Sequence, residues 1–327
     1  MRLSELVAIF VVIIHQANNM KKLLLLLVAV GAIFTACESG LDNEGNGGMS
    51  ADSQKTIFYT SSDGNIVTPY RDYVFGARIV SNTYENGKGV IVFDAPVTSI
   101  GERAFDGCSS LTSITIPNSV TWIRSWAFRE CTSLTSITIP DSVTKIGDRA
   151  FSHCTSLTRV TMPNRITKIE QAVFYGCTSL INITIPDSVT WIGEWAFWNC
   201  ASLTSITIPN SVTEIGVFAF ENCSSLTSIT IPDSVTSIGW EAFAVCTSLT
   251  SVTIGNSVTK IGERAFEYCT SLTSVYCKPT TPPTGDYDMF YYNASGRKIY
   301  VPRNSVDAYK SASYWSGYAS YIEGYDF

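Results

Sequence analysis

The chain has 327 residues, a length that ordinarily corresponds to two or three domains. Its composition, 45% hydrophobic and 15% charged, is that of a globular protein and excludes disorder along the whole chain. The formal net charge is −6 and no basic patch stands out, which argues against a nucleic-acid partner. His15 lies in a segment that we expect to be removed, so a mature chain would keep only His153, and a histidine-based active site is not expected.

Residues 1–36 are interpreted as a leader segment. Met20 and two lysines open a basic stretch, residues 23–33 are an apolar run, and small residues follow it. This is the layout of a secretory signal peptide, and the run is too short to span a bilayer comfortably. Another apolar stretch, residues 6–14, precedes this better signal, so we take Met20 as the true start. One long uncleaved hydrophobic anchor is the alternative.

The end of the leader, Phe34-Thr35-Ala36-Cys37, resembles a bacterial lipobox, although the usual pattern has leucine where Phe34 stands. The resemblance implies that the thiol of Cys37 is acylated, which would make the chain an exported outer-membrane lipoprotein, displayed on the cell surface. Residues 37–53 are rich in glycine, asparagine and acidic residues, and we expect them to form a flexible tether. The alternative is a signal peptide that is cut elsewhere and leaves Cys37 unmodified.

Residues 97–277 contain eight near-identical 23-residue units, and this periodicity is the strongest signal in the sequence. The unit reads V-T-x-I-G-x-x-A-F-x-x-C-x-S-L-T-S-I-T-I-P-x-S. In the first unit, residues 111–116 fit the leucine-rich pattern L-x-x-L-x-L, and their alternation predicts a strand that Pro117 ends. A second short strand is expected at residues 120–123, followed by a helical or 3₁₀ turn at residues 127–128.

A single unit of this kind buries too little apolar surface to fold alone, so the array needs stacked neighbours and a cap at each end. We expect an N-terminal cap at residues 54–96, with strands at 57–59 and 89–93. An aromatic C-terminal cap is expected at residues 278–327. It would hold a last strand at 299–302, a short helix that begins at Asn304 or Ser305, and a second helix at 312–321. The predicted fold class is therefore a β-rich leucine-rich-repeat solenoid with parallel strands and short turns.

One cysteine recurs in every unit. Equivalent residues of stacked units lie about 4.8 Å apart, a spacing that would permit disulfide rungs. A metal site is not favoured, because no C-x-x-C pair occurs and no histidine recurs beside the column. We favour thiols that fill small apolar holes in the core, and we expect no cofactor. The column consists of Cys108, Cys131, Cys154, Cys177, Cys200, Cys223, Cys246 and Cys269.

The unit A-F-x-x-C-x-S-L-T-S-I-T-I-P-x-S-V-T-x-I-G resembles the BspA-type leucine-rich repeats of bacterial surface proteins, over about residues 55–327. The segment 299–309 is also similar to the terminal segment of such proteins from Bacteroides-like bacteria. The resemblance implies surface display and binding of a protein ligand, either host extracellular matrix or another bacterial surface, without catalysis. It does not identify the ligand. We expect a monomer that contacts the membrane only through its N-terminal lipid.

Six tryptophans occupy positions that are polar in sister units. In the column that holds Trp122 and Trp191, the units between them carry Lys145 and Lys168. Exposed rings spaced in this way could anchor a partner protein, or could stack on sugars in a glycan-binding accessory lipoprotein. The alternative is aromatic packing on the convex side without a ligand. The six candidates are Trp122, Trp126, Trp191, Trp195, Trp198 and Trp240.

The predicted sheet face carries columns of serine and threonine and lacks the tryptophan, tyrosine and arginine that dominate binding interfaces. Arg159 is its strong exception and joins the candidates. Three Asp-Ser-Val segments resemble the sites at which Bacteroides-type bacteria attach O-glycans, which implies modification at Ser142, Ser188 and Ser234. The alternative is a turn in which the aspartate caps its own backbone.

Overall fold

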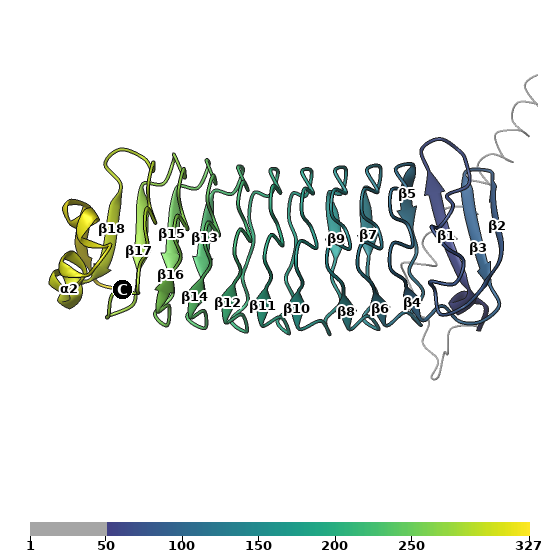
Figure 1. The fold of residues 1–327 in the computed structure, drawn as a ribbon, viewed down its shortest axis with the longest axis horizontal. Coiled ribbons are helices and arrows are strands. Elements are labelled where there is room, and N and C mark those ends of the chain that lie inside the picture. Colours follow the sequence, from purple (N-terminus) through teal and green to yellow (C-terminus); the bar gives the residue numbers. More distant parts are fainter. Residues whose placement is uncertain (1–50) are drawn as a thin grey trace, which may run out of the picture. The chain divides into compact units, whose positions relative to one another are not determined.

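The computed structural model describes residues 51–327, so the predicted leader, Cys37 and nearly all of the tether lie outside the described residues. The described chain winds into stacked turns that lie side by side (Figure 1). Strands of successive turns pair in parallel with partners 23 residues apart, as Lys168 pairs with Trp191 and Trp191 with Glu214. The predicted parallel-stranded solenoid with 23-residue units is therefore confirmed.

Two rows of strands follow the stack. The long row contains the leucine-rich strands β5 (Leu111–Ile114), β7 (Ser136–Thr138), β9 (Arg159–Thr161), β13 (Ser228–Ile231), β15 (Ser251–Ile254) and β17 (Ser274–Cys277). The short row contains β4 (Ser99–Ile100), β6 (Trp122–Ile123), β8 (Lys145–Ile146), β10 (Lys168–Ile169), β11 (Trp191–Ile192), β12 (Glu214–Ile215), β14 (Ser237–Ile238) and β16 (Lys260–Ile261). The second strand of each unit is thus two residues long, shorter than the predicted 120–123.

The third side of each unit, which the sequence predicts as a helical or 3₁₀ turn, is a run of overlapping hydrogen-bonded turns. Alternate amides there point along the stack: the Phe105 N–H donates to the Ala127 carbonyl in the next unit at 2.7 Å. The amide between them stays within the unit, since Ala104 N–H donates to Gly101 O at 3.1 Å. This alternation needs left-handed backbone, and Trp126 and Glu130 have φ of 57° and 58°.

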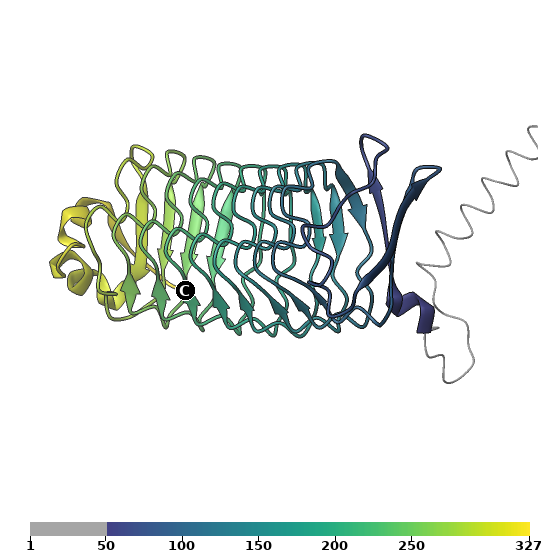
Figure 2. The same ribbon diagram turned by 45° about the vertical axis from the view of Figure 1, so that its right-hand side comes forward.

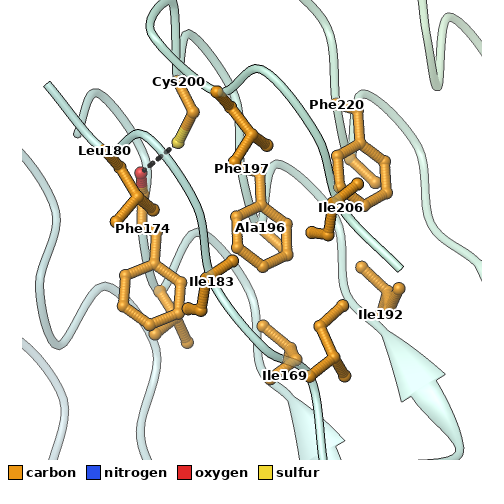
Figure 3. Packing of buried hydrophobic residues seen from close by; sticks show 14 of the residues in the cluster. Ile169, Phe174, Leu180, Ile183, Ile192, Ala196, Phe197, Cys200, Ile206 and Phe220 are labelled. Carbon is orange, nitrogen blue, oxygen red and sulfur yellow. Dashed lines mark hydrogen bonds between the residues drawn. The ribbon is translucent and has the colours of Figure 1, made fainter. Parts of the chain in front are cut away.

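The core is built from the same buried side chains in every turn, as Figure 3 shows for the middle of the stack. One phenylalanine per unit is fully buried, and successive rings stack 5.1–5.7 Å apart. Each buried cysteine of the repeat column contacts the backbone of an earlier turn, as the Cys200 Sγ donates to the Phe174 carbonyl at 3.3 Å. Because these contacts repeat, each turn supplies the apolar surface that its neighbour needs.

The N-terminal cap is an antiparallel sheet that stands at one end of the stack (Figure 2). It contains β1 (Thr56–Ser61), β2 (Ile79–Glu85) and β3 (Lys88–Phe93), in the order β2-β3-β1-β5. The strands expected at 57–59 and 89–93 lie within β1 and β3, whereas β2 was not predicted. Phe93 and Phe75 continue the phenylalanine stack to Phe105, with centroids 5.0 and 5.7 Å apart.

The C-terminal cap extends the long row with β18 (Lys298–Pro302) and β19 (Ile322–Tyr325). Between them lie α2 (Val306–Ser311) and a 3₁₀ helix at Ser316–Tyr321, which is shorter than the predicted helix at 312–321. Ser305 is the N-cap residue of α2, but its hydroxyl donates to the Thr280 carbonyl instead of capping the helix. Trp315 is fully buried against Phe290, where the phenylalanine stack ends.

One junction between turns is open. Between the third unit (143–165) and the fourth (166–188), β8 does not pair with β10, and β9 does not pair with residues 182–184. Among the described residues this is the one junction between units at which neither row pairs. The turn side stays bonded there, since Phe151 N–H donates to Val173 O at 3.0 Å. The third and fourth units therefore stay bonded along the turn side, while the long row keeps a single long bond, from Ile181 N–H to Thr158 O at 3.5 Å.

Two substitutions account for this opening. At the glycine of the repeated I-G pair the chain passes very close to the preceding unit: a Cβ on Gly147 would lie 2.6 Å from the Ser125 nitrogen. The fourth unit has Glu170 in place of this glycine, and the third unit has Arg165 in place of a serine that elsewhere bonds the carbonyl 22 residues earlier, on the neighbouring turn. Arg124 also replaces the glycine, yet its N–H still donates to Ile100 O at 2.8 Å. The opening therefore reflects both substitutions together.

Candidate binding surfaces

A groove of about 630 Å³ lies where the loop 70–76 of the N-terminal cap faces the first two units. We call it the N-terminal groove. The loop supplies one wall, and residues in and beside β4 and β6 supply the other, because β1 and β3 hold the cap against the first unit. Its charged and aromatic lining residues are Tyr70, Arg71, Tyr73, Glu102, Arg103, Trp122 and Arg124.

The arginines of the groove are stacked on aromatic rings. The Arg71 guanidinium lies 5.1 Å from the Tyr70 ring and donates a 2.7 Å hydrogen bond to the Tyr73 hydroxyl, which raises the pKa of Arg71. The Arg124 guanidinium lies 4.1 Å from the Trp122 ring. Stacking of this kind restricts a guanidinium while leaving its N–H edge free for hydrogen bonds.

Two donors on lining residues have no acceptor in the described part of the chain. The indole Nε1 of Trp122 and the Nε of Arg103 are both buried and make no hydrogen bond. The nearest carboxylate to Arg103 is that of Asp106, whose Oδ2 lies 4.0 Å from Nε, too far for a hydrogen bond. The lining of the groove contains three arginines, and Glu102 is its one acidic residue.

The predicted tryptophan surface is largely packed against neighbouring units. Trp240 is the one exposed member of the six, at 42%, and the other five are half-buried. Trp198 stacks on Tyr175 at 4.4 Å and donates from Nε1 to Glu221 at 2.9 Å. A lysine at the equivalent position of the neighbouring unit also covers a tryptophan ring: Lys168 Nζ lies 5.6 Å from the Trp191 ring.

An aromatic column on the turn side brings two of the tryptophans together. Trp195 stacks on Phe218 at 5.6 Å, and Trp240 packs on the far side of Phe218 at 4.8 Å. Trp126, one of the two tryptophans in the first three units, lies apart from this column and packs under the Arg103 guanidinium at 5.1 Å. The six residues thus form separate small clusters, not one continuous platform.

Arg159 lies exposed on β9, on the face of the long row. It lines a second groove, of about 530 Å³, together with Asp141, Asn164 and Asn182. No ion pair of Arg159 is formed within residues 51–327. This groove lies at the open junction between the third and fourth units.

The serines of the three Asp-Ser-Val segments are half-buried, and their hydroxyls connect successive turns of the stack. Ser142, Ser188 and Ser234 donate from Oγ to the carbonyl 22 residues earlier at 2.7, 2.6 and 2.7 Å. Ser211 makes the same bond at 2.6 Å, although no aspartate precedes it. An O-glycan on any of these hydroxyls would have to break a bond between successive turns of the stack.

The cysteine column lies in the core. Seven of the eight repeat cysteines are fully buried, Cys108 is partly exposed, and all eight are free thiols. Burial raises the pKa of the Cys154 thiol to about 12 and that of Cys108 to about 11. Across residues 51–327 no group of histidine, cysteine and acidic residues is placed to hold a metal ion. In the same part of the chain, no helix has the length and apolarity needed to cross a membrane.

Sequence reasoning did not identify two of these features as sites. The groove loop carries the segment Tyr-Arg-Asp-Tyr at 70–73, whose mixture of aromatic and charged residues was an available signal. At the other end of the stack, exposed tyrosines of the last unit and the C-terminal cap form pairs. Tyr268 stacks on Tyr292 at 4.8 Å, and Tyr287 meets Tyr314 edge to face at 5.1 Å.

Comparison with known proteins gives one family match and several similar structures. Residues 78–204 and 192–316 match the family described as the BspA type leucine rich repeat region (6 copies). A leucine-rich-repeat protein of T. pallidum is 36% identical over 48% of this chain and 72% of its own, with a TM-score of 0.45. One from Bacteroides ovatus is 24% identical, covering 75% of this chain and 90% of its own, with a TM-score of 0.38. A leucine-rich cell surface protein of Faecalibacterium prausnitzii is 23% identical, over 76% and 90%, with a TM-score of 0.38. No curated protein matches.

Proposed function

The chain belongs to the BspA-type leucine-rich-repeat family, and from this premise we propose that it is a cell-surface binding protein that recognises a protein partner through the N-terminal groove. The repeats supply a rigid scaffold, and such scaffolds mediate protein interactions in this family. The observation that carries the proposal is the lining of the groove. Tyr73, Trp122 and Arg124 represent the three residue types that contribute most binding energy at protein interfaces.

The face of the long row is a weaker candidate for this role. Its exposed positions are mostly serine and threonine, as at Ser136 and Thr138, and these rarely anchor an interface. The groove instead combines a concave surface with a strongly exposed ring, since Tyr73 is 65% exposed. A partner that covers this ring would remove a large apolar area from water.

The proposal includes export, acylation at Cys37 and display of a monomer on the outer membrane. Its partners would be host matrix proteins or the surfaces of other bacteria, and no catalysis is involved. Labelling with a palmitate analogue tests the anchor, because the wild-type chain should take up the label and Cys37→Ser should not. An unlabelled wild-type chain would contradict the anchor and leave the binding proposal standing.

Binding is tested on cells that display the full-length chain, with immobilised matrix proteins and partner bacteria as targets. Tyr70→Ala combined with Tyr73→Ala should weaken binding at least about tenfold, as expected for the loss of interface anchors. The matched control is Tyr291→Ala combined with Tyr292→Ala, which removes two exposed tyrosines at the opposite cap and should leave binding unchanged. Equal binding by both double variants would refute the groove, and no binding by the wild type would refute the function.

Glycan binding is the second candidate, because Trp240 extends an aromatic column that already contains Trp195 and Phe218. An exposed ring on a rigid column can stack on the apolar face of a sugar. On a glycan array, Trp240→Ala should abolish the signal, while Trp126→Ala, which removes a ring outside this column, should not. A wild-type chain that binds no glycan on the array would eliminate this candidate.

A further inference from the structure

We propose that the N-terminal groove selects an acidic peptide segment of its partner, whose carboxylates are bound by Arg71, Arg103 and Arg124. This inference rests on the proposed protein-binding function and specifies the chemistry that the groove recognises. It assigns a ligand class to a surface that is otherwise defined only by its shape.

The first argument is local charge. The chain as a whole carries a net charge of −6, whereas the groove is lined by three arginines and one glutamate. In the described part of the chain neither Arg71 nor Arg124 forms an ion pair, and the only contact of Arg103 with a carboxylate is the 4.0 Å approach to Asp106. Three arginines thus line the groove, and two of them, Arg71 and Arg124, have no ion pair within the described residues. An anionic segment is the partner that this charge complements.

The second argument is the geometry of the arginines. Arg124 stacks on Trp122 at 4.1 Å, and Arg103 on Trp126 at 5.1 Å, so these side chains are already ordered before a ligand arrives. A planar guanidinium binds a carboxylate through two parallel hydrogen bonds, and an ordered one loses less entropy when it does so. The groove is therefore preorganised for carboxylate side chains.

The same stacking disfavours a neutral sugar. A sugar ring stacks on an open aromatic face, but the Trp122 ring is approached by both Arg124 and Lys145, at 4.1 and 5.3 Å. The Tyr70 and Tyr73 rings are likewise approached by Arg71, at 5.1 and 5.8 Å. The aromatic residues of the groove serve to hold cations in place.

The third argument is the balance of donors and acceptors. The lining carries the N–H donors of three arginines, and the carboxylate of Glu102 is its one acidic acceptor. A ligand rich in acceptors complements a lining that is rich in donors. Each aspartate or glutamate of a peptide brings two carboxylate oxygens as well as its backbone carbonyl. The volume of about 630 Å³ suits a few such residues rather than a folded domain.

The test uses fluorescein-labelled deca-glutamate and the full-length chain in detergent, with binding followed by fluorescence anisotropy. Wild type should bind, and raising the salt concentration should weaken binding, because exposed charges are screened. Arg71→Ala combined with Arg124→Ala should weaken binding at least about tenfold, the expected loss for charged hydrogen bonds. Replacing both residues by lysine should restore binding only in part, since lysine lacks the bidentate fork.

The matched control is Arg159→Ala combined with Arg165→Ala, which removes the same charge from exposed residues outside the groove. It should change the affinity less than about twofold, as surface charges at a distance contribute little. An equal loss in both double variants would show that only net charge matters and would overturn the proposal. Binding of a heparin-derived sulfated oligosaccharide without binding of deca-glutamate would also overturn it.

A competition experiment separates this inference from the proposed function. Deca-glutamate should displace the matrix protein or bacterial partner from cells that display the wild-type chain. If the partner binds, and the Tyr70 and Tyr73 variant loses it, but deca-glutamate neither binds nor competes, then the acidic specificity is wrong and the binding function stands. If no partner binds at all, the function itself fails.

Discussion

Single residues on the turn side carry backbone strain. Val245 has φ of 59°, and this left-handed conformation is unfavourable for a β-branched residue. It is imposed because the Val245 N–H donates along the stack to Glu267 O at 2.8 Å. Sister units place Asn199 and Asn222 at this position, and asparagine tolerates the conformation. The Asn222 side chain also donates to that of Asn199 at 2.7 Å.

Val245→Asn should therefore stabilise the chain by about 1 kcal/mol, by relieving strain and extending the asparagine pair. Asn222→Val should destabilise it by about the same amount, because it introduces the strain and breaks the pair. Urea denaturation followed by circular dichroism measures both changes. A lower midpoint for Val245→Asn than for the wild type would show that the valine side chain contributes more by packing than it costs by strain.

The buried thiols give the molecule a predictable response to alkaline pH. Burial raises the pKa of Cys154 and of Cys277 to about 12, from an ordinary value of 9.0. Above pH 9 an unfolded chain releases these protons while the folded chain keeps them, so unfolding becomes more favourable as pH rises. The stability linked to these thiols is complete below pH 9 and is lost progressively toward pH 12.

Denaturation midpoints measured from pH 8 to pH 11 should fall, and the fall should be smaller in Cys154→Ala. Iodoacetamide should leave Cys154 of the folded chain unlabelled at pH 8 and label it after unfolding. Rapid labelling of Cys154 in the folded chain would contradict its burial.

The environment of single residues was only partly predictable. Lysine at sister positions of Trp122 and Trp191 suggested that these tryptophans are exposed, but a lysine stem can lie along an apolar surface while its charge reaches water. Tolerance of lysine is therefore compatible with half-burial, and Lys168 itself covers the Trp191 ring. The groove could not be predicted, because it depends on how the loop at Tyr70 and Tyr73 meets the second unit, more than forty residues later in the sequence.

At the scale of elements, the open junction shows how two substitutions, Glu170 and Arg165, can interrupt two rows of strands. The repeat period predicts which residues pair, and that prediction holds wherever glycine follows the short strand, as at Gly193 and Gly216. The sequence also shows Glu170 in place of the glycine, but Arg124 demonstrates that a side chain there can be tolerated. The opening of the junction therefore depends on Arg165 in the third unit as well as on Glu170 in the fourth.

Glu170→Gly should close the junction, because it removes the Cβ that holds the two units apart. The amides of residues 167 and 170 should then bond to the third unit and exchange with deuterium at least about tenfold more slowly, which corresponds to roughly 1.4 kcal/mol. Hydrogen–deuterium exchange with mass spectrometry measures this. The control is Arg124→Gly, whose amide is already bonded and should not change. Unchanged exchange at residue 167 in Glu170→Gly would mean that Arg165 alone keeps the junction open.

For the whole molecule, stability depends on the two caps. Each unit is stabilised only by the units that it contacts. The last unit has a neighbour on one side, so its stability depends on the cap that covers its other side. Trp315 is fully buried and donates from Nε1 to the Pro283 carbonyl at 2.8 Å. The aromatic tail identified this region as a cap, but β19 was not predicted. Its Ile-Glu-Gly-Tyr sequence is a poor strand former, and it becomes a strand because β18 offers a free edge.

Trp315→Ala should destabilise the chain by about 3–5 kcal/mol, the usual result of truncating a fully buried aromatic residue. The loss should appear in thermal denaturation, and faster exchange should be confined to the turns nearest the C-terminal cap. Trp240→Ala, at an exposed tryptophan, should cost less than about 1 kcal/mol. A similar cost for both variants would show that the cap does not depend on Trp315.

The regular contacts between turns also bear on how such a chain can change over generations. From the fifth unit to the seventh, each turn presents the same phenylalanine face and the same amide pattern to the next. After a genetic deletion or duplication of 23 codons within this stretch, the newly adjacent turns would therefore present matching surfaces and could pack as the present ones do. Each event would move the two ends of the stack about 4.8 Å closer together or farther apart. Copy number could thus adjust the reach of the protein while leaving its recognition end unaltered.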